Sequence, residues 1–143
     1  MNIAQHIALI DELCFRPFPA EHGPSDVGDS GPGYHVAVLE RATDGDPADR
    51  HVTVDQYEKD RDAVYEFLAS RWGDTDPYNL GTVLLRTERE EIPEPWATLS
   101  ARAAVACLWE VEGTGRWVAV AVADRDETDE VELLAVVTQT APP

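Results

Sequence analysis

Residues 103–138 read AAVACLWEVEGTGRWVAVAVADRDETDEVELLAVVT, and this stretch decides the fold. It contains three apolar runs, at 104–111, 117–123 and 131–137, which are separated by two short polar breaks. Each run has the length of a strand, is rich in valine and is bounded by turn residues. The three runs together predict an antiparallel meander, around which the rest of the chain is organised.

The first break, Gly113-Thr114-Gly115, sets the register of the first hairpin, because a slip of one residue turns every side chain of a strand to the opposite face. A two-residue turn at Gly113-Thr114 is typical of a tight hairpin. It would place the large apolar side chains on one face: Val105, Cys107, Trp109, Val111, Val118, Val120 and Val122. The opposite face would carry alanines, two glutamates and one tryptophan: Ala104, Ala106, Glu110, Glu112, Trp117, Ala119, Ala121 and Ala123. A three-residue turn, which is the alternative, would set large residues against small ones, so we favour the two-residue turn.

The second run has no charged residue between Trp117 and Ala123. A strand with one face in water normally alternates apolar with polar residues, so we expect this strand at the centre of the sheet, covered on both faces. Its alanine face is smooth enough for a helix or a second subunit to approach closely. A homodimer is therefore one alternative for the assembly.

The length and composition are those of one globular domain, 1–143. With 143 residues and a hydrophobic fraction of 43%, the chain can bury roughly two-thirds of its unfolded surface. No run approaches the roughly 20 apolar residues of a membrane span, and the N-terminal residues lack the pattern of a signal peptide. Cys14 and Cys107 are far apart and show no metal-ligand spacing, so we expect two reduced thiols. These features favour a cytoplasmic protein that has no membrane partner.

The charge is strongly acidic: 28 acidic residues against 11 basic ones give a net charge of −17. The excess is spread along the chain and is not concentrated in one tail. Such a field repels nucleic-acid phosphates and anionic membranes, and it favours a basic partner unless it serves solubility alone. Ten of the 11 bases are arginine, which together with the many alanines and valines is typical of a GC-rich bacterial genome.

Two main helices are predicted. Residues 2–14 place Ile3, Ile7, Ile10 and Cys14 at helical spacing, which indicates an amphipathic helix. Residues 55–72 form the second helix, with Asp55 as its N-cap, Glu58 completing a capping box, and an apolar face made of Tyr57, Val64, Tyr65, Leu68 and Trp72. Between the two helices, residues 15–33 contain four prolines and four glycines, so we expect a flexible loop there.

Further strands are predicted outside the meander. Residues 34–41 form one strand, a turn-rich loop occupies 43–49, and 51–54 pairs back as a short strand. Residues 80–87 are expected to be a strand, with a short helix as the alternative, and 96–102 to form one or two helical turns. The resulting order of elements predicts an α+β domain with a mostly antiparallel sheet and the two main helices packed on it.

The sequence contains no recognisable catalytic or metal-binding pattern. The polar break 124–130 begins like a calcium loop, but the EF-hand pattern requires a glycine and a glutamate at the positions of Asp129 and Ala135. The four histidines, at positions 6, 22, 35 and 51, lack ligand spacing. We therefore expect no metal, no cofactor and no enzymatic activity.

The leading hypothesis is a non-enzymatic protein-binding module that engages a basic partner. An aromatic residue on a smooth surface with an acidic rim would anchor such a partner; the candidate residues are Trp117, Glu110, Glu112, Asp124, Asp126, Asp129 and Glu130. In size and charge the chain is similar to bacterial immunity proteins, antitoxins and secretion chaperones.

Two alternatives stay open at this point. One is a small-ligand-binding protein or enzyme that uses a pocket beneath loop 15–33, with His22 or His35 contributing. The other is a nucleic-acid mimic, which would need carboxylates at phosphate-like spacing. A deep apolar pocket with converging polar groups favours a ligand, whereas a flat acidic face favours a protein partner.

Overall fold

A computed structural model describes residues 2–42 and 47–143 of the chain. The described residues form a seven-stranded antiparallel sheet in the order β1-β2-β3-β7-β6-β5-β4. The strands are β1 (Gly23–Pro24), β2 (Gly28–Gly31), β3 (Tyr34–Arg41), β4 (Tyr78–Asn79), β5 (Val105–Val111), β6 (Arg116–Ala123) and β7 (Glu132–Thr138). The helices are α1 (Ile3–Leu13), α2 (Arg50–Trp72), α3 (Leu80–Arg86) and α4 (Trp96–Arg102), and a 3-10 turn, η1, spans Pro47–Asp49. The predicted α+β class is confirmed.

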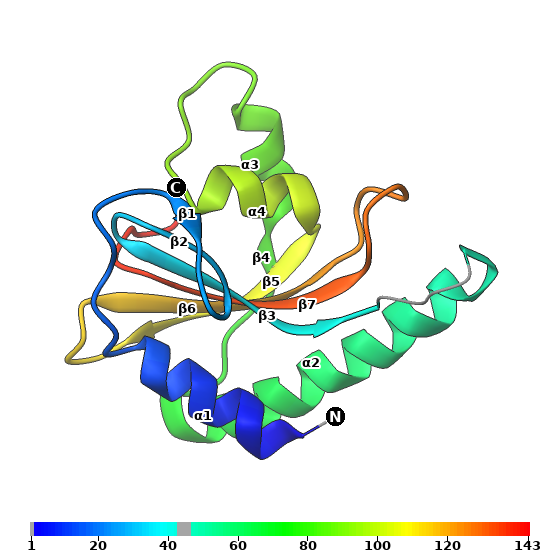
Figure 1. Cartoon of the computed structure of the whole chain (residues 1–143), viewed down its shortest axis with the longest axis horizontal. Helices are drawn as coiled ribbons and strands as arrows, with labels where there is room; N and C mark the ends of the chain where they lie inside the picture. Colours follow the sequence, from blue (N-terminus) through cyan, green and yellow to red (C-terminus); the bar gives the residue numbers. More distant parts are fainter. Residues whose placement is uncertain (1, 43–46) are drawn as a thin grey trace.

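The molecule has three layers, with helices on both faces of the sheet (Figure 1). Helices α1 and α2 pack on the face that carries Trp109, Val118, Val120 and Val122, which we call the valine face. Helices α3 and α4 pack on the opposite face, which carries Ala106, Ala119, Ala121 and Ala123 and which we call the alanine face. Within the described residues, no helix is both long enough and apolar enough to cross a membrane.

The predicted meander and its register are confirmed. Trp109 pairs with Val118 and Cys107 with Val120, which is the register that a Gly113-Thr114 turn requires. The turn itself is wider than expected, because strand pairing ends at Val111 and Arg116. The N–H of Thr114 donates to the carbonyl of Val111 across 3.3 Å. Gly113 has φ 79°, in the left-handed region that favours glycine, and this lets the chain reverse without a side-chain clash.

Both faces of β6 are covered, as predicted for a strand without charges. The small side chains of the alanine face let α3 and α4 approach the sheet closely, and Trp96 of α4 is fully buried there. Helices of the same chain, and not a second subunit, therefore cover these alanines. Since α1 packs on the valine face, it does not cover Trp117, which alternates with Val118 and so lies on the alanine face.

The predicted strand at 51–54 is wrong, because these residues lie in the first turns of α2. The helix begins at Arg50, so Asp55 is an interior residue that forms an ion pair with Lys59 at 3.2 Å and is not the N-cap. The β-branched residues at 52–54 favour strands locally, but packing of Val54 and Tyr57 against the core extends the helix through them. Residues 43–46 of the expected turn-rich loop lie outside the described residues.

The predicted strand at 80–87 is also wrong, and the alternative of a short helix holds. Asn79 caps α3 by accepting the N–H of Gly81 at 2.9 Å. Leu80 and Val83, one helical turn apart, are buried against α4 and the alanine face. The helical turns expected at 96–102 are present as α4.

The segment 15–33 contains two strands, β1 and β2, which extend the sheet beyond β3. Neither strand has an apolar alternation, so backbone hydrogen bonds form them: β2 pairs with β3, and β1 pairs with β2. A side chain at Gly28 would place its Cβ 2.2 Å from the carbonyl oxygen of Val36, so this close pairing requires glycine. Phe15 is 76% exposed and does not reach the core, whereas Phe18 lies beneath the guanidinium of Arg116. The flexibility expected for this segment stays a prediction.

A β-bulge in β3 decides which face of the sheet each of two charged residues occupies. The pairing with β7 shifts between Val38 and Glu40, so Glu40 pairs with Leu133, whose side chain belongs to the valine face. Arg41 then pairs with Glu132, on the alanine face. Without the bulge, Glu40 would pair with Glu132 on the alanine face and Arg41 would lie on the valine face, so the extra residue exchanges the faces of these two side chains.

Candidate functional site

One candidate site is a cleft of about 450 Å³ between α4 and the β1–β3 side of the sheet. Its floor is apolar and consists of Val36, Val38, Leu134 and Val136. One wall comes from α4 and the residues before it, and the other from β1, β2 and the residues beside them: Glu94, Pro95, Thr98, Leu99, Arg102, His22, Gly23, Gly28 and Asp29. The volume lies within the range of small-molecule sites, roughly 300–1,000 Å³.

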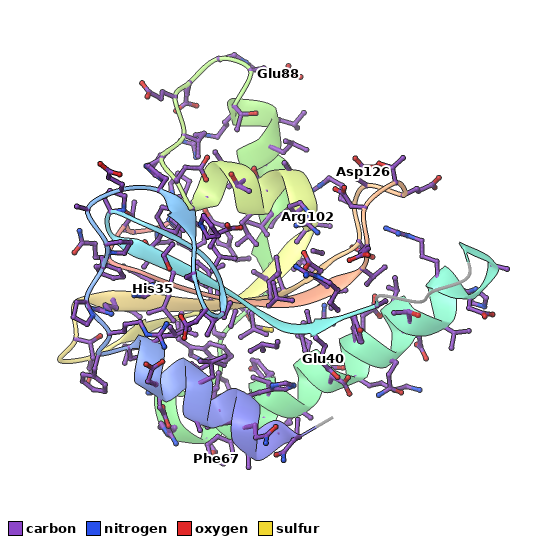
Figure 2. The ribbon with its side chains drawn as sticks, in the orientation of Figure 1. His35, Glu40, Phe67, Glu88, Arg102 and Asp126 are labelled. Atoms are coloured by element: carbon purple, nitrogen blue, oxygen red, sulfur yellow. The ribbon has the colours of Figure 1, made fainter. Side chains whose placement is uncertain are left out.

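At one end of the cleft, Glu132 is buried between two arginines. Arg41 Nη2 lies 2.6 Å from Glu132 Oε2, and Arg102 Nη2 lies 2.9 Å from Glu132 Oε1. Each arginine also approaches a second carboxylate, Glu130 at 3.5 Å from Arg41 and Asp129 at 3.6 Å from Arg102. Figure 2 shows Arg102 at the end of α4 that lies toward the β6–β7 hairpin. Because three carboxylates surround the two cations, an anionic ligand would have to displace Glu132 to reach them.

At the other end, the hydroxyl of Tyr34 lies 2.7 Å from Nδ1 of His22. Burial raises the pKa of Tyr34 above its ordinary value, and the negative charges of Glu94 and Asp29 raise it further. These two carboxylates therefore lie within electrostatic range of the Tyr34 hydroxyl, on opposite walls of the cleft. Glu94 Oε2 accepts the N–H of Thr98 at 3.2 Å. Among residues 2–42 and 47–143, no ion pair engages Asp29 or Glu94.

On the valine-face side of β3, Ser30 and His35 form a buried polar pair. Ser30 Oγ lies 2.8 Å from His35 Nδ1, and His35 Nε2 lies 3.3 Å from the carbonyl of Arg16. Since a carbonyl only accepts, Nε2 carries the proton and Nδ1 accepts the hydroxyl hydrogen of Ser30. Burial lowers the pKa of His35 and keeps the ring neutral.

The Ser30–His35 pair has the first feature of an activated nucleophile, a hydroxyl oriented toward a base. A depression of about 430 Å³ lies beside it, lined in part by residues 16–19. However, Ser30 is only 5% exposed and His35 only 2%, and the two residues are direct cross-strand partners. The arrangement therefore joins β2 and the chain at Arg16 to β3, and it does not present the hydroxyl to a substrate.

A third polar cluster lies between β3 and helices α1 and α2, where Figure 2 shows Glu40 on the α2 side of the sheet. Glu40 shares a hydrogen bond with the buried carboxyl of Asp60, which requires a proton on one of the two groups. Burial, followed by Asp60, raises the pKa of Glu40 to about 7. Gln56 donates to Asp60 at 2.9 Å. His6 Nε2 lies 3.9 Å from Glu40 Oε2, too far for a hydrogen bond, and burial lowers the pKa of this histidine.

The seven predicted partner-binding residues fall into two groups at opposite ends of β6. Trp117, with Glu110 and Glu112, lies at the β5–β6 hairpin, and Trp117 pairs directly with Glu110. The other four residues, Asp124, Asp126, Asp129 and Glu130, lie at the β6–β7 hairpin (Figure 1). Seven residues of strand separate the two groups by about 23 Å at 3.3 Å per residue. The structure therefore does not bring them together into one surface.

The acidic hairpin at 124–130 is held by the chain's own arginines. Arg50 donates to the carbonyls of Asp129, Asp126 and Asp124, at 2.6, 2.7 and 3.2 Å. The side chain of Asp126 accepts the N–H of Thr128 at 2.9 Å, which closes a local turn. These hydrogen bonds tie the hairpin to the start of α2.

Both cysteines are free thiols, as predicted, and burial raises their pKa, that of Cys14 to about 11. In the part of the chain that the structure describes, no group of three His, Cys, Asp or Glu side chains could hold a metal ion. Comparison with protein-family models, curated proteins and solved structures finds no match. The functional inference therefore rests on the residues of this chain.

Of the residues that form these clusters, the sequence singled out His22 and His35 beneath segment 15–33. His22 does line the cleft, and His35 lies on the other face of β3. Sequence reasoning missed the ion-paired end of the cleft and the Glu40–Asp60 pair. One signal for the pair was available: Asp60 lies three residues after Tyr57 and four before Val64, on the predicted apolar face of the helix.

Proposed function

We propose that this protein is a non-enzymatic binding module that engages a basic protein partner. The observation that carries the proposal is the unequal use of its charges. Carboxylates outnumber the lysine and arginine side chains by 17, 28 against 11, so one-to-one pairing within the chain cannot neutralise them. Several arginines are moreover engaged by backbone carbonyls of the chain itself.

Arg116, Arg50 and Arg125 illustrate this internal use of the cations. Arg116 donates to the carbonyls of Leu13 and Arg16, both at 2.7 Å, and thereby joins α1 to β6. Arg50 binds the three carbonyls of the β6–β7 hairpin, and Arg125 donates to the carbonyl of Ala103 at 2.9 Å. Positive charge is thus used within the molecule, while the excess of carboxylates is left for solvent or a partner. Such a field attracts basic proteins and accelerates their association.

This proposal includes a cytoplasmic location, a bacterial origin and no direct binding of nucleic acid or membranes. Immunity proteins, antitoxins and secretion chaperones, which are similar in size and charge, are the functional classes that we favour. A homodimer remains compatible with it.

The second candidate function is binding of a small ligand, and the cleft favours it. Its apolar floor, the His22–Tyr34 pair and the two carboxylates Asp29 and Glu94 converge as in a ligand pocket. Because the two arginines at the far end are already paired, a small ligand would be a cation with an apolar part. Both candidate functions therefore require a positively charged binding partner. They differ in whether that partner is a protein or a small molecule.

The proposal is tested by affinity capture from an extract of the source organism, followed by binding measurements with each purified candidate. We expect a partner with a basic surface whose dissociation constant increases with salt concentration. A variant with Asp124, Asp126, Asp129 and Glu130 neutralised serves as the comparison protein and should associate more slowly. If every purified candidate binds both proteins equally and independently of salt, the proposal is wrong.

A further inference from the structure

The floor of the cleft is an apolar strip that its neighbours only partly cover. Leu134 and Val136 of β7 are buried beneath α4, but Val36 and Val38 of the neighbouring strand β3 are only half-buried. Half-buried apolar side chains at the bottom of a cleft of about 450 Å³ gain from further burial, at roughly 25 cal/mol for each Å² of apolar surface. The floor therefore favours an occupant with an apolar part.

The charges that line the cleft select the sign of that occupant. Three carboxylates and two guanidinium groups line it, which leaves one net negative charge. Glu132 pairs with both Arg41 and Arg102, so the two remaining carboxylates, Asp29 and Glu94, are the groups without an ion pair within the described ranges. Both line the cleft, Asp29 from β2, where it pairs with Val36, and Glu94 from the segment before α4. These two carboxylates favour a cationic group in the cleft.

We propose that the cleft is the docking site for a basic segment of the protein partner. An arginine or lysine side chain of that segment lies with its methylene groups on Val36 and Val38 and with its charged group between Asp29 and Glu94. Long basic side chains combine an apolar stem and a charged head in this way. The inference rests on the proposed function and adds to it the site and the side-chain chemistry that this site recognises.

The site is tested on the full chain by titrating the ¹⁵N-labelled protein with a peptide probe and following its amide resonances. The probe is acetyl-Gly-Arg-Leu-Arg-Leu-Arg-Gly-amide, and its control is the same peptide with neutral citrulline in place of arginine. L-argininamide serves as a small cation that lacks neighbouring residues. We expect the arginine peptide to shift amides of β2, β3 and the start of α4, and to bind at least tenfold more tightly than the citrulline peptide.

Two double variants separate the cleft from the general acidic field. Asp29→Asn with Glu94→Gln removes two charges from the cleft, and Glu58→Gln with Glu66→Gln removes two exposed charges from α2, on the other face of the sheet. We expect the cleft variant to weaken peptide binding by at least about fivefold, and the α2 variant by less than about twofold. The spectrum of each variant without peptide shows directly whether its fold is retained.

Each outcome supports or overturns a stated part of the proposal. Scattered amide shifts, with equal weakening by both double variants, would overturn the cleft as the docking site and leave the basic-partner function standing. Equal binding of the arginine and citrulline peptides would overturn both the docking site in the cleft and the basic-partner function. If L-argininamide binds as tightly as the peptide, the cleft is a small-cation site, and docking of a protein segment is wrong.

Discussion

Replacing Glu40 with glutamine should stabilise the fold above about pH 7 and leave its stability nearly unchanged near pH 4.5. The Glu40 side chain is 21% exposed, and burial together with Asp60 raises its pKa from 4.5 to about 7. Between these two values the folded state holds a proton that the unfolded state has lost. Stability must therefore fall as pH rises through this window, and the loss is complete above the folded pKa.

The size of the effect follows from the difference between the two pKa values. At 1.36 kcal/mol per unit, a rise from 4.5 to about 7 corresponds to roughly 3 kcal/mol of unfolding free energy. Glutamine cannot ionise, and its amide can still donate a hydrogen bond to Asp60. We therefore expect Glu40→Gln to exceed the wild type by about 1–3 kcal/mol at pH 8, and to differ by less than about 0.5 kcal/mol at pH 4.5.

Urea unfolding followed by tryptophan fluorescence measures both values. Glu91→Gln is the matched control, because Glu91 is exposed and its replacement removes the same charge from the protein. This control separates the buried pair from the general reduction of negative charge. If Glu40→Gln is no more stable than Glu91→Gln at the higher pH, ionisation of Glu40 does not carry the predicted cost and the reasoning is refuted.

Three further predictions concern the core, the sheet edge and the net charge. Trp109 is 4% exposed and its indole N–H donates to the carbonyl of Gly73, so Trp109→Ala should cost about 3–5 kcal/mol in denaturant unfolding. The exposed control Glu127→Ala should cost about 0.5 kcal/mol or less, and equal costs would mean that the core is misplaced. Gly28→Ala should cost about 1–3 kcal/mol or more of unfolding free energy, because its Cβ would overlap the Val36 carbonyl. The control Gly23→Ala meets no atom within 4 Å and should be nearly neutral, and equal melting temperatures of the two variants would contradict the close β2–β3 pairing. Raising the salt concentration from about 0.01 to 0.15 M shortens the screening length from roughly 30 to 8 Å and should raise the melting temperature, and an unchanged or lower value would mean that the charges are locally compensated.

The meander could be predicted because its signals are local. Alternation of valine with alanine in 117–123 sorts two kinds of side chain onto two faces, and only one register keeps them sorted across the hairpin. The absence of charge in this run likewise indicates a strand that is covered on both faces. The structure confirms these inferences through the pairing of Trp109 with Val118 and the helices on both faces of the sheet.

The two wrong strand predictions share a physical cause. Residues 51–54 and 80–87 are short and rich in β-branched or aliphatic residues, and such runs cannot be assigned from propensity alone. Tertiary packing decides them: Val54 contacts the core from α2, and Leu80 with Val83 contacts it from α3. At 51–54, the helical spacing of Val54, Tyr57 and Val64 was the signal that could have extended the helix.

The cleft could not be assembled from sequence patterns, because its parts lie more than 100 residues apart. Strand β3 lies between β2 and β7, and α4 packs over this part of the sheet, so that Asp29, Glu94 and Leu134 line one space. The bulge between Val38 and Glu40 contains no glycine or proline that would mark it. Because this bulge decides which faces Glu40 and Arg41 occupy, the sequence did not indicate that Arg41 meets Glu132 or that Glu40 meets Asp60.

The central claim, that the excess negative charge serves to recruit a basic partner, is tested most directly by the association rate constant of the purified partner. Stopped-flow measurements over about 0.05 to 0.5 M salt separate electrostatic steering from short-range contacts, because screening acts mainly on the approach of the two molecules. We predict that the rate constant falls at least about tenfold over this range, and that neutralising the four acidic residues of the β6–β7 hairpin reduces the dependence. A rate constant that is the same at low and high salt, for both proteins, would contradict the claim and leave the charge as a device for solubility.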